Sequence, residues 1–355
     1  MSVSLVRHVS RQPVVITGGA GFIGINLAHR LLRAGRRVRI YDNLSRRGAE
    51  RNLRWLRSVH GSRLQVQQGD VRSAGGIREA LTDIGTVFHL AAQVAVTASL
   101  ADPRDDFAVN AEGTLNVLEE IRRAGRQIGL IFTSTNKVYG ALEDIPLVAS
   151  PKRYDPAGGL LGIDEARQLS FHSPYGCSKG TADQYVLDYA RGYAIDATVF
   201  RMSCIYGPHQ HGTEDQGWVA HFLIRAAQNL PITIYGDGKQ VRDLLYVDDL
   251  IEAFLRAEEC LPQIAGQAFN IGGGAANTIS LGELIELIAV LNGAAPEIVY
   301  GPWRAGDQRW YVCDAGKFQR ATGWRPKTGI EEGIHRLHEW VSASCSMAPA
   351  ARMIG

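Results

Sequence analysis

Short apolar runs alternate with helical patterns over the first two-thirds of the chain. Each run is a candidate for a buried strand, and the runs lie at residues 13–17, 38–41, 64–66, 86–90, 129–133 and 197–200. Between the runs, apolar residues recur with a helical period, notably at 22–34, 110–124 and 175–194. Continuously apolar strands that alternate with helices indicate a parallel sheet with helices on both faces. The pattern therefore predicts a doubly wound α/β domain, which is the Rossmann type of fold.

The regular alternation weakens after about residue 208, where glycine and proline interrupt the chain at 236–238, 272–274 and 301–302. We expect a smaller C-terminal α/β lobe there, placed over the carboxyl edge of the sheet. A segment at about 244–275 should return to the first lobe. The predicted domains are residues 12–208 with about 244–275, and residues 209–243 with 276–342, between flexible ends at 1–11 and 343–355.

Composition narrows the class of protein. The 355 residues include 38 Lys and Arg against 36 Asp and Glu, and this near-balance argues against a nucleic-acid binder. No apolar run reaches the ~18 residues that span a bilayer, and the first residues lack the apolar block of a signal peptide. The five cysteines never occur in CxxC spacing, which disfavours a disulfide framework or a zinc ribbon. We expect a cytoplasmic protein without membrane or nucleic-acid partners.

A metal site is not expected either. His209 and His211 lie near Asp215, but they lack a third ligand at a familiar spacing.

The segment 17–24, TGGAGFIG, joins the first predicted strand to the first predicted helix. Gly18 permits a tight turn, Gly21 lets the backbone approach a pyrophosphate, and Gly24 permits close packing of the helix on the strand. A phosphate then lies on unpaired amides at the helix N-terminus, where Phe22 and Ile23 stand. This context of strand, turn and helix indicates a dinucleotide site.

Asp42, which ends the second predicted strand, bears on the identity of the dinucleotide. A carboxylate there accepts hydrogen bonds from ribose hydroxyls and repels a 2′-phosphate, so it favours NAD over NADP. Arg46 and Arg47 could argue the reverse, but the arginines that follow them lie on one solvated helix face. Asp70 and Val71, after the third strand, are placed to meet the adenine. We therefore expect NAD as the cofactor.

Tyr175 and Lys179 are four residues apart on a predicted helix and so lie on the same face. The charge of Lys179 favours the phenolate and should move the pKa of Tyr175 towards neutrality, where the phenol can act as a general base. A hydroxyl from the stretch 133–135, at the end of the fifth strand, can hold a substrate alcohol against Tyr175. Reactive groups gather at this carboxyl edge in α/β enzymes.

Five motifs carry a resemblance to a known family, namely TGGAGFIG, YDN, FHLAA, TSTNKVYG and SPYGCSK. They resemble the extended short-chain dehydrogenase/reductase family of nucleotide-sugar enzymes, over about residues 13–340. The resemblance implies that Thr135, Tyr175 and Lys179 remove a hydroxyl proton while hydride passes to a retained NAD. Further contacts with the cofactor are then expected from Asn43, Ser45, Arg46, Leu90, Ala91, Ala92, Gln93, Asn110, Ser134, Tyr175, Lys179 and Cys204.

The residues after Thr135 distinguish between activities within this family. The family's 4,6-dehydratases carry Asp-Glu directly after the threonine, whereas this chain has Asn136 and Lys137. Without that pair, water elimination lacks its proton donor and acceptor, so a dehydratase is not expected. Cys204 stands near the place where 4-epimerases of the UDP-galactose type usually have an asparagine, which weakens that alternative.

Longer segments resemble a narrower group, the CDP-paratose 2-epimerases, also called CDP-tyvelose epimerases. These segments are residues 41–46, 134–140, 171–180, 215–219, 238–243 and 307–309. The resemblance implies inversion at carbon 2 of a CDP-hexose, of the CDP-paratose/CDP-tyvelose or CDP-glucose/CDP-mannose type, by transient oxidation to a 2-keto sugar. A UDP-hexose 4-epimerase and a net NAD-dependent sugar oxidoreductase remain alternatives. A homodimer formed through the helices at 110–124 and 175–194 is also implied.

Return of hydride to the opposite face requires the keto sugar to reorient, so binding energy should concentrate on the nucleotide diphosphate. Arg242 and Arg304 are the expected diphosphate clamps, because guanidinium groups give bidentate, charge-assisted hydrogen bonds. By position in the family, the other residues expected at the substrate are Gln93, Thr135, Asn136, Gln216, Trp218, Tyr235 (base) and Asp307 (ribose).

Overall fold

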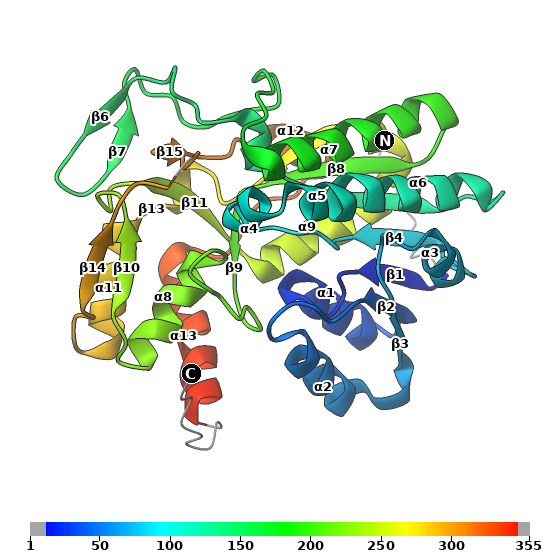
Figure 1. The fold of residues 1–355 in the computed structure, drawn as a ribbon, viewed down its shortest axis with the longest axis horizontal. Helices are drawn as coiled ribbons and strands as arrows, with labels where there is room; N and C mark the ends of the chain where they lie inside the picture. Colours follow the sequence, from blue (N-terminus) through cyan, green and yellow to red (C-terminus); the bar gives the residue numbers. More distant parts are fainter. Residues whose placement is uncertain (1–11, 305, 347–355) are drawn as a thin grey trace, which may run out of the picture.

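The computed structural model describes residues 12–304 and 306–346, and its centre is a parallel sheet of seven strands in the order β12-β8-β5-β4-β1-β2-β3 (Figure 1). The strands are β1 (Val14–Thr17), β2 (Val38–Asp42), β3 (Leu64–Gln68), β4 (Thr86–His89), β5 (Gly129–Thr135), β8 (Ala197–Met202) and β12 (Ala268–Ile271). The six predicted strand positions and the doubly wound α/β fold are confirmed. Strand order reverses between β1 and β4, which is where such sheets bind ligands at their carboxyl edge.

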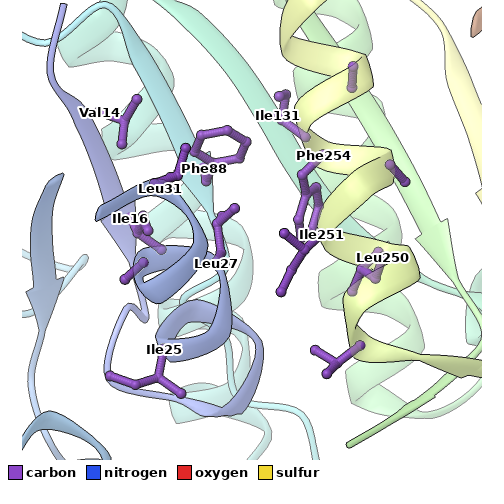
Figure 2. Packing of buried hydrophobic residues seen from close by; sticks show 14 of the residues in the cluster. Val14, Ile16, Ile25, Leu27, Leu31, Phe88, Ile131, Leu250, Ile251 and Phe254 are labelled. Atoms are coloured by element: carbon purple, nitrogen blue, oxygen red, sulfur yellow. The ribbon is translucent and has the colours of Figure 1, made fainter. Parts of the chain in front are cut away.

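Helices cover both faces of this sheet, because consecutive strand residues point to opposite sides. On one face Val14 and Ile16 of β1 meet α1 and α9, whereas Val15 faces the other layer. Figure 2 shows Ile25, Leu27 and Leu31 of α1 facing Leu250, Ile251 and Phe254 of α9 across Phe88 and Ile131. The helices of this layer are α1 (Phe22–Arg33), α2 (Ala49–His60), α9 (Val247–Glu259), α10 (Leu261–Ile264) and α12 (Gly316–Thr322).

The opposite layer carries the helix with the predicted Tyr-Lys pair. It contains α3 (Ala74–Ala80), α4 (Val96–Ala101), α5 (Pro103–Phe107), α6 (Gly113–Arg123) and α7 (Ser173–Tyr193). The helix expected at 110–124 begins differently, because a π-helical turn, η2 (Ala108–Glu112), precedes α6. Three 3₁₀ turns complete the short helices, at η1 (Gly61–Arg63), η3 (Asn136–Tyr139) and η4 (Ala275–Asn277).

A second lobe lies beside the carboxyl edge of the sheet (Figure 1). Its core joins three helices, α8 (Trp218–Ala227), α11 (Leu281–Asn292) and α13 (Ile330–Ser346), to small sheets. The strands of these sheets are β9 (Cys204–Tyr206), β10 (Ile232–Tyr235), β11 (Val241–Tyr246), β13 (Thr278–Ser280), β14 (Ile298–Gly301) and β15 (Trp310–Tyr311). A separate hairpin pairs β6 (Leu147–Ala149) with β7 (Tyr154–Pro156).

The chain crosses between the lobes more than once, since α9 and β12 return to the central sheet. Strand β12 and helix α9 lie in the first lobe, but α12, expected in the second, packs on β12 and buries Phe318 against Phe200 and Phe269. A flexible end was expected from residue 343, yet α13 continues to Ser346 because its last turns still contact the core through Cys345. Residues 347–355 and 1–11 lie outside the described residues.

Among the helices of residues 12–304 and 306–346, none is both long enough and apolar enough to cross a bilayer.

Candidate active site

Glycine is required at Gly18, in the loop between β1 and α1, and at Gly24, in the first turn of α1. Gly18 has φ +67°, and a Cβ there would lie 2.7 Å from the backbone nitrogen of Ala91. A Cβ at Gly24 would lie 2.5 Å from the carbonyl oxygen of Gly18. Gly21 caps α1 without a side-chain hydrogen bond, so the first-turn amides of Phe22 and Ile23 have no intrahelical acceptor. This geometry fits an anionic pyrophosphate at the helix N-terminus.

The residues predicted for the adenine ribose meet at the ends of β2 and β3. Asp42 accepts hydrogen bonds from two backbone amides, at 2.9 and 2.8 Å, which orient its carboxylate. Burial raises the pKa of Asp42, and the two amide donors oppose that rise. Asn43 donates to Asp70 Oδ2 at 2.9 Å, and Ser45 donates to Asn43 Oδ1 at 2.7 Å. Val71 is buried behind them.

Arg46, in the loop after β2, is exposed. Its charge opposes the rise that burial causes in the pKa of the Tyr175 phenol on α7.

The loop after β4 supplies the next part of the site. Leu90, Ala91 and Ala92 are half-buried there, with the Ala91 nitrogen hydrogen-bonded to Thr17 Oγ1 at 3.3 Å. The closeness of Ala91 to Gly18 brings the ends of β1 and β4 together at the switch point of the sheet.

A buried polar network lies between this loop and α7, centred on Asp106. The Asp106 carboxylate accepts hydrogen bonds from Gln93 Nε2 at 2.9 Å, Asn110 Nδ2 at 3.1 Å and Ser178 Oγ at 2.5 Å. Gln93 and Asn110 were predicted to contact ligands, whereas here their side-chain amides bind this carboxylate. Ser178 occupies the same turn of α7 as Tyr175, so the network holds the start of that helix against the loop.

Thr135, Tyr175 and Lys179 converge at the carboxyl end of β5. Thr135 lies beside the phenol of Tyr175 and lowers the pKa of that phenol against the larger effect of burial, while the Thr135 hydroxyl donates to Asn136 Oδ1 at 3.3 Å. Lys179 is buried and its Nζ donates to the carbonyl oxygen of Thr133 at 2.6 Å. The trio therefore brings a phenol, a hydroxyl and an amine to one edge of the sheet.

The expected lowering of the Tyr175 pKa towards neutrality does not occur in this structure. Burial raises the pKa of Tyr175 to about 12, despite the opposing effects of Thr135 and Arg46. Burial also lowers the pKa of Lys179 to about 7, although Asp183 and Asp106 favour its charged form. Desolvation therefore raises the pKa of Tyr175 and lowers that of Lys179, and general-base action by Tyr175 needs additional positive charge nearby.

The residues predicted for the substrate form two groups on the second-lobe side. In the first, Arg242 is 7% exposed and donates to Asp307 Oδ1 at 2.7 Å. Asn136 Nδ2 donates to Gln308 Oε1 at 3.3 Å, directly after the catalytic strand. Burial raises the pKa of the Cys204 thiol, while the charge of Arg242 opposes the rise.

The second group is built around Arg304. Its guanidinium lies 3.9 Å above the ring of Tyr235 and 3.4 Å from Asp215 Oδ1. Tyr235 in turn donates to Glu214 Oε1 at 2.6 Å, beside the turn that carries Gln216. The two arginines predicted as one diphosphate clamp therefore have different partners. Trp218, at the start of α8, lies near the Cys204 thiol of β9 and lowers the pKa of that thiol against the larger effect of burial.

The first-lobe residues fit a bound dinucleotide. Gly18 and Gly24 leave space that any Cβ would fill, and α1 offers amide donors to a phosphate. Ser134 is 3% exposed, and its hydroxyl has no hydrogen-bond partner within residues 12–304 and 306–346. A buried, unpaired hydroxyl beside the catalytic threonine is suited to a ligand that supplies its partner.

Comparisons with known proteins agree with this geometry. Residues 14–272 match the family model for the NAD dependent epimerase/dehydratase family. The CDP-paratose 2-epimerase of Salmonella typhi is 42% identical over 337 residues, which cover 93% of this chain and 99% of that protein.

Solved structures agree as well. The UDP-glucose 4-epimerase of Thermotoga maritima with UDP-glucose has a TM-score of 0.81 at 31% identity, covering 94% of this chain and 99% of that one. The UDP-glucose 4-epimerase of Thermus thermophilus in complex with NAD has a TM-score of 0.77 at 32% identity, covering 93% and 98%. The chain belongs to the NAD-dependent epimerase/dehydratase family, and it is an epimerase of that family with NAD as its cofactor.

Proposed function

We propose that this epimerase inverts carbon 2 of a CDP-hexose through a transient 2-keto sugar. The observation that carries the proposal is the 42% identity, over almost the full length of both chains, with the CDP-paratose 2-epimerase of Salmonella typhi. The replacement of the dehydratase Asp-Glu pair by Asn136 and Lys137 supports epimerisation over water elimination. A homodimer formed through α6 and α7 stays a prediction.

The geometry at the end of β5 supports a simple division of work. Thr135 holds the carbon-2 hydroxyl beside Tyr175, and Tyr175 accepts the hydroxyl proton once it has been ionised to the phenolate. Lys179 provides an amine whose charged form is favoured by Asp106 and Asp183. NAD, when bound, supplies the two-electron oxidation of the alcohol and its reversal. Tyr175 then returns the proton, after the keto sugar has turned its other face to the site.

The protein should keep its contacts to the nucleotide while the keto sugar reorients. Arg242 and Asp307 form one rigid anchor, and Arg304 with Tyr235 forms another on the same lobe. Both anchors leave the sugar itself to weaker contacts, as reorientation requires.

A UDP-hexose 4-epimerase is the second candidate, because solved UDP-glucose 4-epimerases share this fold at TM-scores of 0.81 and 0.77. A panel of CDP- and UDP-sugars separates the two, with NMR identifying the carbon that inverts. We expect inversion at carbon 2 with a CDP-sugar and no accumulation of NADH. Inversion at carbon 4, or a preference for UDP-sugars, would contradict the proposal. Net formation of NADH would indicate an oxidoreductase instead.

Isotope retention tests the redox step separately from the choice of sugar. Substrate deuterated at the inverting carbon should keep its label, because the hydride returns from the same cofactor molecule. Product formed in heavy water should remain unlabelled at that carbon. Mass spectrometry or NMR reports both results, and washout of the label would show proton exchange at a carbon acid instead.

A further inference from the structure

Lys137 occupies a partly buried position between the catalytic strand and the substrate-side residues. It belongs to η3, and its backbone amide donates to Thr135 Oγ1 at 3.2 Å. Its Nζ donates to the carbonyl oxygen of Gly306 at 3.2 Å and lies 3.9 Å from Asp307 Oδ1. The side chain is 21% exposed, so a ligand can still reach it.

The charges around Lys137 do not balance. Its titratable neighbours are Arg242 of β11, Asp307 before β15 and Cys204 of β9. Arg242 and Lys137 share the single carboxylate of Asp307, while burial keeps the Cys204 thiol protonated by raising its pKa. Two cations against one anion leave an excess positive charge at a partly buried place, which favours an anionic ligand.

The protonation of Lys137 points the same way. Burial, followed by the charge of Arg242, lowers the pKa of Lys137 to about 8 against the opposing effects of Asp307 and Cys204. An anion placed beside the amine would restore its charged form. Without such a ligand, the pKa of the Lys137 amine stays below its usual value, so part of the amine is uncharged near pH 8.

The chemistry of carbon 2 identifies the anion. In a nucleotide hexose, carbon 2 is bonded to the anomeric carbon that carries the diphosphate, whereas carbon 4 lies on the far side of the ring. Presenting the carbon-2 hydroxyl to Thr135 and Tyr175 therefore draws the sugar-linked phosphate towards the end of β5. Lys137, whose amide already binds the Thr135 hydroxyl, is a cation at that end that also faces the substrate-side residues Arg242 and Asp307.

We propose that Lys137 binds the sugar-linked phosphate of the substrate and so selects carbon 2 for presentation to Thr135 and Tyr175. This role rests on the proposed function, since it assigns the phosphate by its closeness to carbon 2. A lysine suits the task, because its compact ammonium on a flexible stem can follow a phosphate while the sugar turns.

Binding measurements on the full-length protein with NAD test the role directly. In Lys137→Met, the dissociation constant of CDP should rise about tenfold to a hundredfold, the usual value of a hydrogen bond to a charged group. The affinity for CMP, which lacks the sugar-linked phosphate, should stay unchanged, and so should the bound NAD content. Lys137→Arg should recover most of the CDP affinity because it keeps the charge.

Lys152→Met is the matched control, because Lys152 is a 59% exposed lysine paired with Glu286 on the surface. It should bind CDP as the natural protein does. The CDP affinity of the natural protein should also fall above pH 8, as Lys137 loses its proton, and this fall should be absent in Lys137→Met. Equal losses of CDP and CMP affinity, or no loss of either, would overturn the proposal.

The same measurements distinguish this role from the proposed function. If the sugar panel shows inversion at carbon 4, the proposed function fails, and selection of carbon 2 by Lys137 fails with it. If inversion occurs at carbon 2 but Lys137→Met leaves the dissociation constant of CDP unchanged, only the proposed role of Lys137 fails. With UDP-sugars as substrates, UDP and UMP replace CDP and CMP in the comparison.

Discussion

Replacement of Tyr175 by phenylalanine should lower kcat by about 10²–10⁴-fold, the usual contribution of a positioned general base. The substitution removes only the phenolic oxygen, whose pKa is lowered by the neighbouring Thr135 at the end of β5. The ring that fills this buried position remains, so bound NAD and the folded structure should persist. Steady-state kinetics gives kcat, and release of the nucleotide on denaturation gives the NAD content.

Tyr189→Phe provides a control on the same helix. Tyr189 is 8% exposed, and its hydroxyl donates to Glu119 Oε1 at 2.8 Å, on the side that packs against α6. Loss of this hydroxyl should leave kcat close to that of the natural protein. Similar kcat values for the two variants would refute the assignment of Tyr175 as the base.

Asp183→Ala should lower the free energy of unfolding by about 3–5 kcal/mol, because it leaves a buried arginine without its counter-ion. Asp183 of α7 accepts two hydrogen bonds from Arg201 of β8, both 2.9 Å long, and the side chains are 0% and 5% exposed. Arg201 also donates to the Tyr139 hydroxyl at 3.2 Å. The unpaired guanidinium would have to remain desolvated or open the packing of α7 on β8.

Chemical denaturation of the NAD-bound protein measures this loss, and Asp188→Ala is its surface counterpart. Asp188 pairs with Arg191 at 3.8 Å on the same helix, but both side chains are 69% exposed. Removal of such a pair should cost less than about 1 kcal/mol. If both variants lose the same small amount, the buried pair does not stabilise the fold as argued.

The fold could be predicted because its signals are local and repeat along the chain. Most strands of the first lobe up to β8 are short apolar runs, and sequential strands in such sheets lie close together. The edge strand β12 had no comparable signal, because it pairs with β8 only after the chain has crossed the second lobe. The same long return explains why α12 was assigned to the wrong lobe.

The cofactor loop and the Tyr-Lys pair could be predicted for the same reason. Gly18, Gly24 and Asp42 belong to one continuous strand-turn-helix-strand unit, so their spacing fixes their geometry. Tyr175 and Lys179 share one helix face by periodicity alone. The direction of the Tyr175 pKa could not be predicted in this way, because it depends on how deeply tertiary packing buries the phenol.

Asp106 and Lys137 had no recognisable signal of a role. Asp106 lies within an acidic, proline-containing stretch that is typical of a solvated turn, yet the fold buries it to 1% exposure. Its partners Gln93 and Ser178 come from separate elements. Lys137 was used only to exclude a dehydratase, because its contacts with Gly306 and Asp307 join residues far apart in the chain.

The return of the chain to the central sheet limits how this enzyme can diversify. A fragment that stops before α9 would expose the face of β1, β4 and β5 that this helix covers, and it would also lack β12. Neither half can therefore be excised, shuffled or grafted as one contiguous cassette. New sugar specificities must arise by point substitution at residues that join the two lobes, such as Asn136 and Lys137, rather than by exchange of an entire lobe.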